Sequence, residues 1–244
     1  MTQQTALAPV MPFRVATYNV HACIGTDGRH DPDRVATVIR ELEADIVALQ
    51  EFTYPATVAL ETRQPVVLTA LVEYECVLGP ARKTVAQCFG NALLSRHPVV
   101  EVHRIDLSVG RREPRGALAA TVDVGGIPLR ILAVHLGLSL RERRFQVRQI
   151  IDYLDSLHGT PCVVLGDFND WLPGYSVVHV LDRRLGRPPC PVSFPVSWPI
   201  VPLDRIWVHP MRVLQRVFAH TTPTARLASD HFPVVADLDS RQLV

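Results

Sequence analysis

Apolar residues occur along the chain in short runs that are separated by Gly, Pro, Asn and Asp. The runs are rich in Val, Ile, Leu and Ala, and their length predicts buried β-strands. We expect strands at 13–20, 45–51, 90–95, 117–124, 129–135, 162–167, 203–208 and 232–238. Gly125 and Gly126 stand between two of these runs and predict a hairpin turn.

Two segments have apolar residues at helical spacing instead, at 30–45 and 141–159. In the first, Asp31 is suited to cap the helix and Pro32 to occupy its first turn. In the second, Gly159 follows the apolar stripe and predicts the end of the helix. Strands outnumber helices, and this balance favours an α/β protein with a mixed sheet.

The rest of the chain is less regular. A third helix is expected near 174–184, whereas 55–72 is ambiguous because Pro65 interrupts it. Residues 186–202 contain six prolines and predict a long irregular loop, a type of loop that often serves function. We expect a loose tail at 1–11 followed by a single domain at 12–244.

Composition narrows the function classes. The net charge is +1, which gives no global attraction to nucleic acid or to anionic membranes. The five cysteines are scattered without a C-x-x-C motif, so neither a disulfide framework nor a structural zinc site is expected. No signal peptide or transmembrane segment is recognisable, and a cytoplasmic location without an obligate protein partner is the expectation.

Several predicted strands end in polar side chains that can bind a metal or move a proton. Such residues at or just after strand ends are Asn19, His21, Gln50, Glu51, His135, Asp167 and Asn169, and the last two predicted strands are flanked by Asp204, Asp230 and His231. Sites in α/β proteins form where the carboxyl ends of strands meet, and all of these positions are compatible with one sheet edge.

The residue types in this set favour one kind of chemistry. Asn, Glu and Asp supply the oxygen ligands that Mg²⁺ prefers, and the absence of thiolates from the set disfavours zinc. Histidines oriented by acids can transfer protons and hydrogen-bond a phosphate. The combination indicates a metal-assisted centre that cleaves a phosphodiester or a phosphomonoester.

Seven motifs carry a family resemblance: TYNVH (17–21), LQE (49–51), GNALLSR (90–96), VHLGLS (134–139), GDFN (166–169), LDRIWV (203–208) and SDHFPV (229–234). In this order they resemble the signatures of the endonuclease/exonuclease/phosphatase superfamily, over about residues 13–238. The resemblance implies a four-layer α/β/β/α sandwich in which two packed mixed β-sheets are flanked by helices. It also implies hydrolysis of P–O bonds with Mg²⁺, or with Mn²⁺ as a substitute.

The resemblance assigns roles by motif. Asn19 and Glu51 correspond to metal ligands, and Asp230 to a ligand or to a support of one. Asp167 and Asn169 correspond to the pair that positions and deprotonates the attacking water.

Other motif positions correspond to groups that contact the phosphate. His231 takes this role with Asp204 as the partner that fixes its tautomer, and His135 hydrogen-bonds the phosphate or assists the leaving group. Asn91 resembles a further phosphate contact, and Arg115 is suited to bind phosphate through its guanidinium.

Two loops and one variable position bear on the choice of substrate. The loop at 108–116 is basic, and its Arg111, Arg112 and Arg115 are suited to bind phosphate, although Arg111 and Arg112 could equally belong to a solvated charged loop. We expect His21 to be peripheral, either near the metal or packed. The loop at 187–202 carries Phe194 and Trp198 and suits a lipid or another amphiphilic substrate, although it could equally be a wall packed on the sheet.

Three functions therefore remain in view. The first is a phosphodiesterase that acts on a small or lipid phosphodiester. The second is a DNA endonuclease or exonuclease of the repair type, for which Arg111, Arg112 and Arg115 are the motivation, although the net charge does not favour nucleic acid. The third is a catalytically silent binding module, which the complete set of polar residues disfavours.

Overall fold

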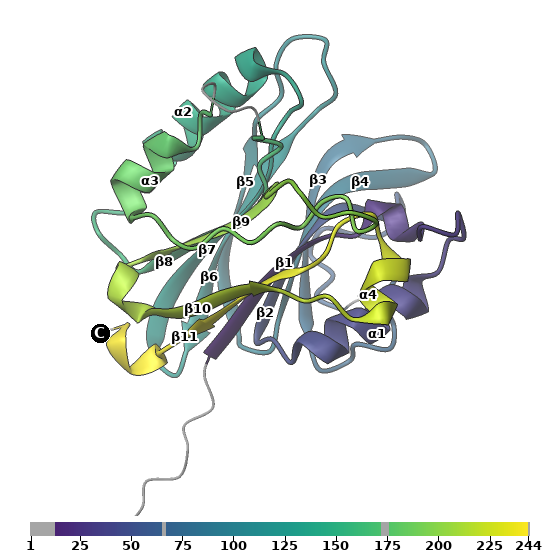
Figure 1. Cartoon of the computed structure of the whole chain (residues 1–244), viewed down its shortest axis with the longest axis horizontal. Helices are drawn as coiled ribbons and strands as arrows, with labels where there is room; N and C mark the ends of the chain where they lie inside the picture. The colour runs from purple at the N-terminus through teal and green to yellow at the C-terminus, as the bar shows by residue number, and fades with distance from the viewer. Residues whose placement is uncertain (1–12, 65–66, 172–175, 244) are drawn as a thin grey trace, which may run out of the picture.

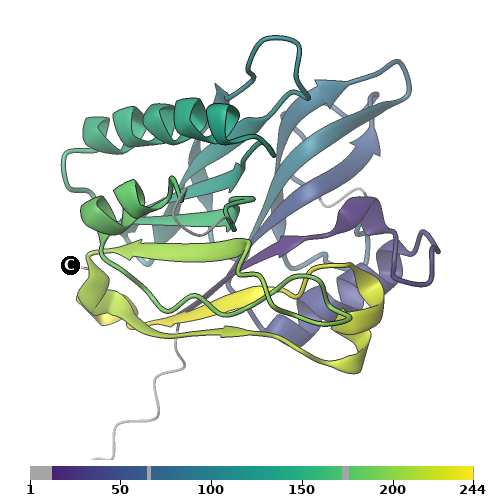
Figure 2. The same ribbon diagram turned by 45° about the horizontal axis from the view of Figure 1, so that its top comes forward.

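The structure is a computed structural model that describes residues 13–64, 67–171 and 176–243 (Figure 1). The tail predicted at 1–11 and the interrupting Pro65 lie outside these residues. Between the first and last described residues, the chain forms two β-sheets with helices on their outer sides (Figures 1 and 2).

The first sheet has six strands in the order β10-β11-β1-β2-β4-β3. β1 and β2 are parallel, and the other neighbours are antiparallel. The strand bounds are β1 Phe13–Asn19, β2 Ile46–Pro55, β3 Glu75–Lys83, β4 Gln87–Ser95, β10 Leu214–Ala219 and β11 Val234–Leu238.

The second sheet has five strands in the order β5-β6-β7-β8-β9, and only β7 and β8 are parallel. Its strands are β5 Val99–Asp106, β6 Gly116–Val124, β7 Ile127–His135, β8 Cys162–Asp167 and β9 Asp204–His209. Gly125 and Gly126 both have positive φ in the β6–β7 turn, so the predicted hairpin is confirmed.

Helices cover the outer face of each sheet (Figures 1 and 2). The α-helices are α1 Pro32–Leu42, α2 Leu140–Ser156, α3 His179–Leu185 and α4 Pro223–Ala228, and short 3₁₀ helices are η1 His21–Cys23, η2 Met211–Val213 and η3 Ser240–Gln242. α1 and α4 lie on the six-stranded sheet, and α2 and α3 lie on the five-stranded sheet.

Local sequence explains where the two long helices begin. The Asp31 side chain accepts a hydrogen bond from Arg34 N, and Pro32 occupies the first turn of α1, as predicted. Ser139 caps α2 in a capping box with Glu142, so α2 begins before the arginine-rich stretch. No helix or strand follows β2 within the described part of 56–72.

Three layers of buried apolar residues hold the four structural layers together. One lies between α1, α4 and the six-stranded sheet, one between the two sheets, and one between the five-stranded sheet and α2 with α3. The α/β/β/α sandwich implied by the resemblance is therefore confirmed. Among the described helices, none has the length and apolar character needed to cross a lipid bilayer.

Candidate active site

The polar strand ends come from both sheets. β1 and β2 belong to the six-stranded sheet, whereas β7, β8 and β9 belong to the five-stranded sheet. The prediction of a single sheet edge is therefore wrong, because the packed sheets bring the ends of β1 and β8 together. The amide nitrogen Nδ2 of Asn19 donates to Asp167 Oδ2 at 3.0 Å and joins the two sheets directly.

Asp167 lies at the centre of this group and is 1% exposed. Its Oδ1 accepts a hydrogen bond from Asn169 N at 2.9 Å, and its Oδ2 accepts the one from Asn19. The same Asn19 nitrogen donates to Glu51 Oε1 at 3.1 Å. The carboxylates of Glu51 and Asp167 are therefore held close together by one shared amide.

The backbone around these residues adopts unusual conformations. Glu51 and Asn169 both have positive φ, and Glu51 lies where the β2–β4 register shifts. Gly166 also has positive φ, and a Cβ there would approach the backbone oxygen of Val134 to 1.9 Å. Local strain of this kind accumulates where a fold must aim a side chain into a site.

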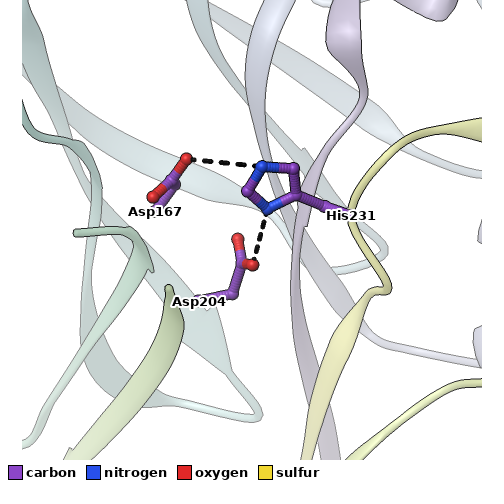
Figure 3. A group of neighbouring side chains, drawn as sticks. All are labelled: Asp167, Asp204 and His231. Carbon is purple, nitrogen blue, oxygen red and sulfur yellow. Dashed lines mark hydrogen bonds and ion pairs between the residues drawn. The ribbon is translucent and has the colours of Figure 1, made fainter. Parts of the chain in front are cut away.

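His231 is positioned by a second acid (Figure 3). Its Nδ1 lies 2.8 Å from Asp204 Oδ2, and its Nε2 lies 4.0 Å from Asp167 Oδ2. The hydroxyl of Ser193 donates to the same Asp204 oxygen at 2.6 Å. Phe194 adds a ring contact to His231, with centroids 4.7 Å apart.

Burial and neighbouring charge set the protonation of this group. Burial raises the pKa of Asp167, and the positive charge of His231 offsets only part of that effect. Burial alone would lower the pKa of His231, but the negative charge of Asp204 holds it above its usual value. His231 is therefore a cation at neutral pH, placed between two carboxyl groups.

His135, at the end of β7, has the opposite character. Its side chain is buried, and its Nε2 lies 3.7 Å from Asp167 Oδ2 and 4.0 Å from Glu51 Oε1, with no hydrogen-bond partner among the described residues. Burial, and then the charges of Arg115 and His231, lower its pKa well below the usual range. A neutral imidazole thus stands at the site with one nitrogen ready for a ligand.

These residues open into one cavity of about 640 Å³. The predicted site residues that line it are Glu51, Arg115, His135, Asp167, Asn169, Phe194, Asp230 and His231. Asn19 and Asp204 are buried directly behind it, in contact with Asp167 and His231 respectively. The cavity brings together residues that are up to 180 positions apart (231 − 51) in the sequence.

Besides Asn19 and Asp204, three further predicted residues do not line the cavity. Asn91 is buried, and its amide nitrogen donates to the backbone oxygens of Gly116 and Ala133. His21 is half-exposed, and its Nδ1 lies 3.1 Å from Ile24 O and 3.9 Å from Asp230 Oδ1. Trp198 projects into solvent from the loop at 187–202.

Other side chains at the site were not anticipated from the sequence. Glu113 lines the cavity and pairs with Arg115 at 2.9 Å, and Ser193 supports Asp204. Leu138, Trp171 and Ile200 line the cavity and are exposed. The available signal was position, since Leu138 lies within the motif at 134–139 that contains His135, and Trp171 closely follows the motif that ends in Asn169.

The oxygen atoms at the site fit a hard divalent cation. Two carboxylates, Glu51 and Asp167, share one Asn19 amide, and Asp230 lines the same cavity. Bringing such charges together costs free energy unless a cation offsets them. Atoms of Asp167, Asp204 and His231 also lie within 4.8 Å of one another, but the Asp204–His231 hydrogen bond already uses His231 Nδ1.

Comparison with known proteins settles the family. A model described as "Endonuclease/Exonuclease/phosphatase family" matches residues 16–231. The chain belongs to the endonuclease/exonuclease/phosphatase family. Family membership assigns it to the hydrolases that cleave phosphate esters, a group of enzymes that generally uses a divalent metal.

Individual relatives extend this comparison. A protein of Escherichia coli K12, "Uncharacterized protein YbhP", is 29% identical over 93% of this chain and 96% of its own length. A solved endonuclease/exonuclease/phosphatase from Beutenbergia cavernae is 25% identical, with a TM-score of 0.71 over 93% of this chain and 71% of its own. A mannosyl-6-phosphatase from Bacteroides thetaiotaomicron shares the fold, with a TM-score of 0.73, 18% identity and coverage of 93% and 99%.

Proposed function

We propose that the protein is a metal-dependent phosphodiesterase whose substrate is a small or lipid phosphodiester. The observation that carries the proposal is the convergence of Glu51, Asp167, His135 and His231 on one cavity from two sheets. Glu51, Asn19 and Asp230 would hold Mg²⁺, or Mn²⁺ in its place. A divalent ion bound there would polarise the phosphoryl group and offset the charge that develops on it.

Asp167 acts as the general base in this proposal. Asn169 N and Asn19 Nδ2 fix its two oxygens, so the carboxylate has a defined orientation toward the cavity. Asp167 takes a proton from water, and the oxygen of that water attacks phosphorus in line with the leaving oxygen. One P–O bond forms and one breaks, and the products are an alcohol and a phosphomonoester.

The two histidines serve the phosphate oxygens. His231, kept cationic by Asp204, donates a charge-assisted hydrogen bond to the phosphoryl group. His135 is neutral, and the nitrogen that lacks a partner, Nε2, faces the same cavity. It either donates to a phosphate oxygen or assists the leaving oxygen.

The charge of the cavity favours a diester over a polyanion. Among its described lining residues, Arg115 is the only arginine or lysine, and Glu113 already pairs with it. On the basic loop, Arg112 lies 3.5 Å from Glu142. A nuclease would use such cations for additional phosphates, so cleavage of plasmid DNA in Mg²⁺ with a steep salt dependence would favour the nuclease instead.

The test is hydrolysis of the soluble diester bis(4-nitrophenyl) phosphate in Mg²⁺. Asp167→Asn removes the base, and the rate is expected to fall about 10²- to 10⁴-fold, the usual contribution of general base catalysis. Asp204→Asn should cost about 10- to 100-fold, because Asp204 acts only through His231. Glu73→Gln, which changes an acid at a separate pocket, is the matched control.

The controls decide how the result is interpreted. Each variant must keep the unfolding transition of the wild-type protein, so that a loss of rate is a loss of chemistry. Wild-type turnover in Asp167→Asn would contradict the assignment of the base. Absence of turnover in the wild-type protein, with monoesters, diesters and DNA all tried, would favour the silent binding module.

A further inference from the structure

Large apolar side chains are exposed around the mouth of the active-site cavity. Leu138 is 71% exposed, Trp171 56%, Trp198 74% and Ile200 63%. Leu138, Trp171 and Ile200 line the cavity, and they come from three separate loops. We call these four residues the apolar rim. Single exposed apolar residues are common, but several gathered at one opening indicate an interaction surface.

Trp198 lies in a segment, 194–201, whose two ends form part of the cavity wall. Phe194 and Val201 line the cavity and pair through a β-bridge, and Trp198 N donates to Pro195 O at 3.1 Å in the turn between them. Trp198 therefore lies in the turn of a narrow excursion, and Ile200 lies at its base, where its backbone nitrogen donates to Phe194 O at 3.1 Å and its side chain lines the cavity.

The two exposed indoles have no polar or ring partner in the described part of the fold. Within the described residues, neither Trp171 nor Trp198 makes a side-chain hydrogen bond or a ring contact with another residue. Moreover, residues 188–203 contain no Asp, Glu, Lys or Arg. Indole side chains on an uncharged loop suit the boundary between hydrocarbon and lipid headgroups.

The rim is held in place before anything binds. Val196 N donates to Asp230 O at 3.0 Å, and Phe232 N donates to Ser193 O at 2.8 Å. These bonds join the loop to the segment that carries His231. Binding through such a loop requires little ordering of the chain, and this lowers its entropic cost.

A basic side chain contacts the wall of the same cavity. Arg82 lies 4.0 Å from Glu113 and over the ring of Phe89, and both of these partners line the cavity. Lys83, next to Arg82 in the sequence, and Arg111, two positions before Glu113, are exposed and make no ion pair within the described residues. Cations next to an uncharged apolar rim complement a surface that contains anionic phospholipid.

We propose that the apolar rim docks on a phospholipid bilayer and brings the cavity to the phosphodiester of a lipid headgroup. A phospholipid carries in one molecule the two features that this opening combines, a phosphodiester and apolar chains. The inference rests on the proposed phosphodiesterase for its meaning, but docking can be measured without turnover.

The test is cosedimentation of the full chain with vesicles of phosphatidylcholine and phosphatidylglycerol. The wild-type protein is expected to sediment with them. Trp198→Ser/Ile200→Ser should weaken partition about tenfold or more, because burying one large apolar side chain is worth at least that factor. Val72→Ser/Val100→Ser, which changes two exposed valines away from the cavity, is the matched control and should bind as the wild type does.

Two further variants in the same vesicle assay separate the contribution of charge to binding from the contribution of turnover. Lys83→Ala/Arg111→Ala should weaken binding at low salt and leave a binding component that salt does not affect. Glu51→Gln, which impairs turnover in the proposed mechanism, should bind vesicles like the wild type, so docking and hydrolysis can fail separately.

Other results would overturn the proposal. The wild-type protein could remain in the supernatant, or the rim variant could bind as well as the control. A dimer in the absence of lipid that Trp198→Ser/Ile200→Ser abolishes would identify the rim as a contact between two copies instead.

Discussion

A buried ion pair supports the two segments that follow His135 and Asp167. Arg143, in α2, is 1% exposed; its Nε lies 3.4 Å from Asp170 Oδ1, and its Nη1 donates to Leu138 O at 2.6 Å. The other oxygen of Asp170 accepts hydrogen bonds from the Ser176 hydroxyl and from the Val177 and Val178 backbone nitrogens. One guanidinium thus links the segment after β7 to the segment after β8.

The perturbation is Arg143→Met, which keeps much of the side-chain volume and removes the charge. Asp170 then remains buried as an anion without its cation, and breaking a buried pair in this way costs about 3–5 kcal/mol. In the double variant Arg143→Met/Asp170→Asn both charges are gone, and an amide oxygen can still accept from the backbone nitrogens. We expect the double variant to lie within about 1–2 kcal/mol of the wild type.

The assay is urea unfolding of the wild-type protein and of the two variants at neutral pH, with the free energy of unfolding compared at equal m-values. Arg184→Met, which removes a half-exposed guanidinium that contacts the exposed Asp155, serves as the control for loss of a surface ion pair and should cost less than about 1 kcal/mol. The reasoning would be refuted by a loss below about 1 kcal/mol in Arg143→Met, or by a double variant no more stable than the single one.

Two further predictions concern Gly166, which precedes Asp167 in β8, and Glu41, which lies in α1. Gly166→Ala is expected to be strongly destabilised or insoluble, because its Cβ would meet the Val134 backbone at 1.9 Å; a wild-type melting temperature would contradict this contact. Burial raises the pKa of Glu41, but hydrogen bonds from Thr222 and His220 lower it more, so the net shift is downward. The charged Glu41 therefore stabilises the fold above its unfolded pKa, and this contribution is lost as pH falls through the folded pKa. The wild-type protein should melt at a higher temperature than Glu41→Gln at pH 6, and this difference should shrink toward pH 3. A difference that grows as the pH falls would contradict the lowered pKa of Glu41.

The sequence predicted the interior of the fold better than its edges. All eight apolar runs form strands, whereas β3, β5 and β10 were missed. Each of these three lies at an edge of its sheet, and β5 has only exposed and half-buried residues rather than a continuous apolar run. Edge strands lack the burial on both faces that makes a strand recognisable from its composition.

The site shows a similar division. The sequence motifs identified the metal-binding and catalytic candidates. Four of these, Glu51, His135, Asp167 and His231, line one cavity in the structure. Pattern alone placed them on one sheet edge, since the packing of two sheets is a tertiary property that strand ends do not encode. Residues that hydrogen-bond the site residues were not predicted for the same reason. Ser193, for example, is not recognisable in the sequence as a partner of Asp204, because only the fold brings the two together.

The most direct test of the central claim is a calorimetric titration of the wild-type protein with Mn²⁺, beside Glu51→Gln and the control Glu73→Gln. If carboxylates from the two sheets form a cation site, the wild type and Glu73→Gln will bind Mn²⁺ and Glu51→Gln will bind it at least about tenfold more weakly, since a metal site depends on its ligand charge. Equal Mn²⁺ affinity in all three proteins, or no binding to the wild type, would contradict the account.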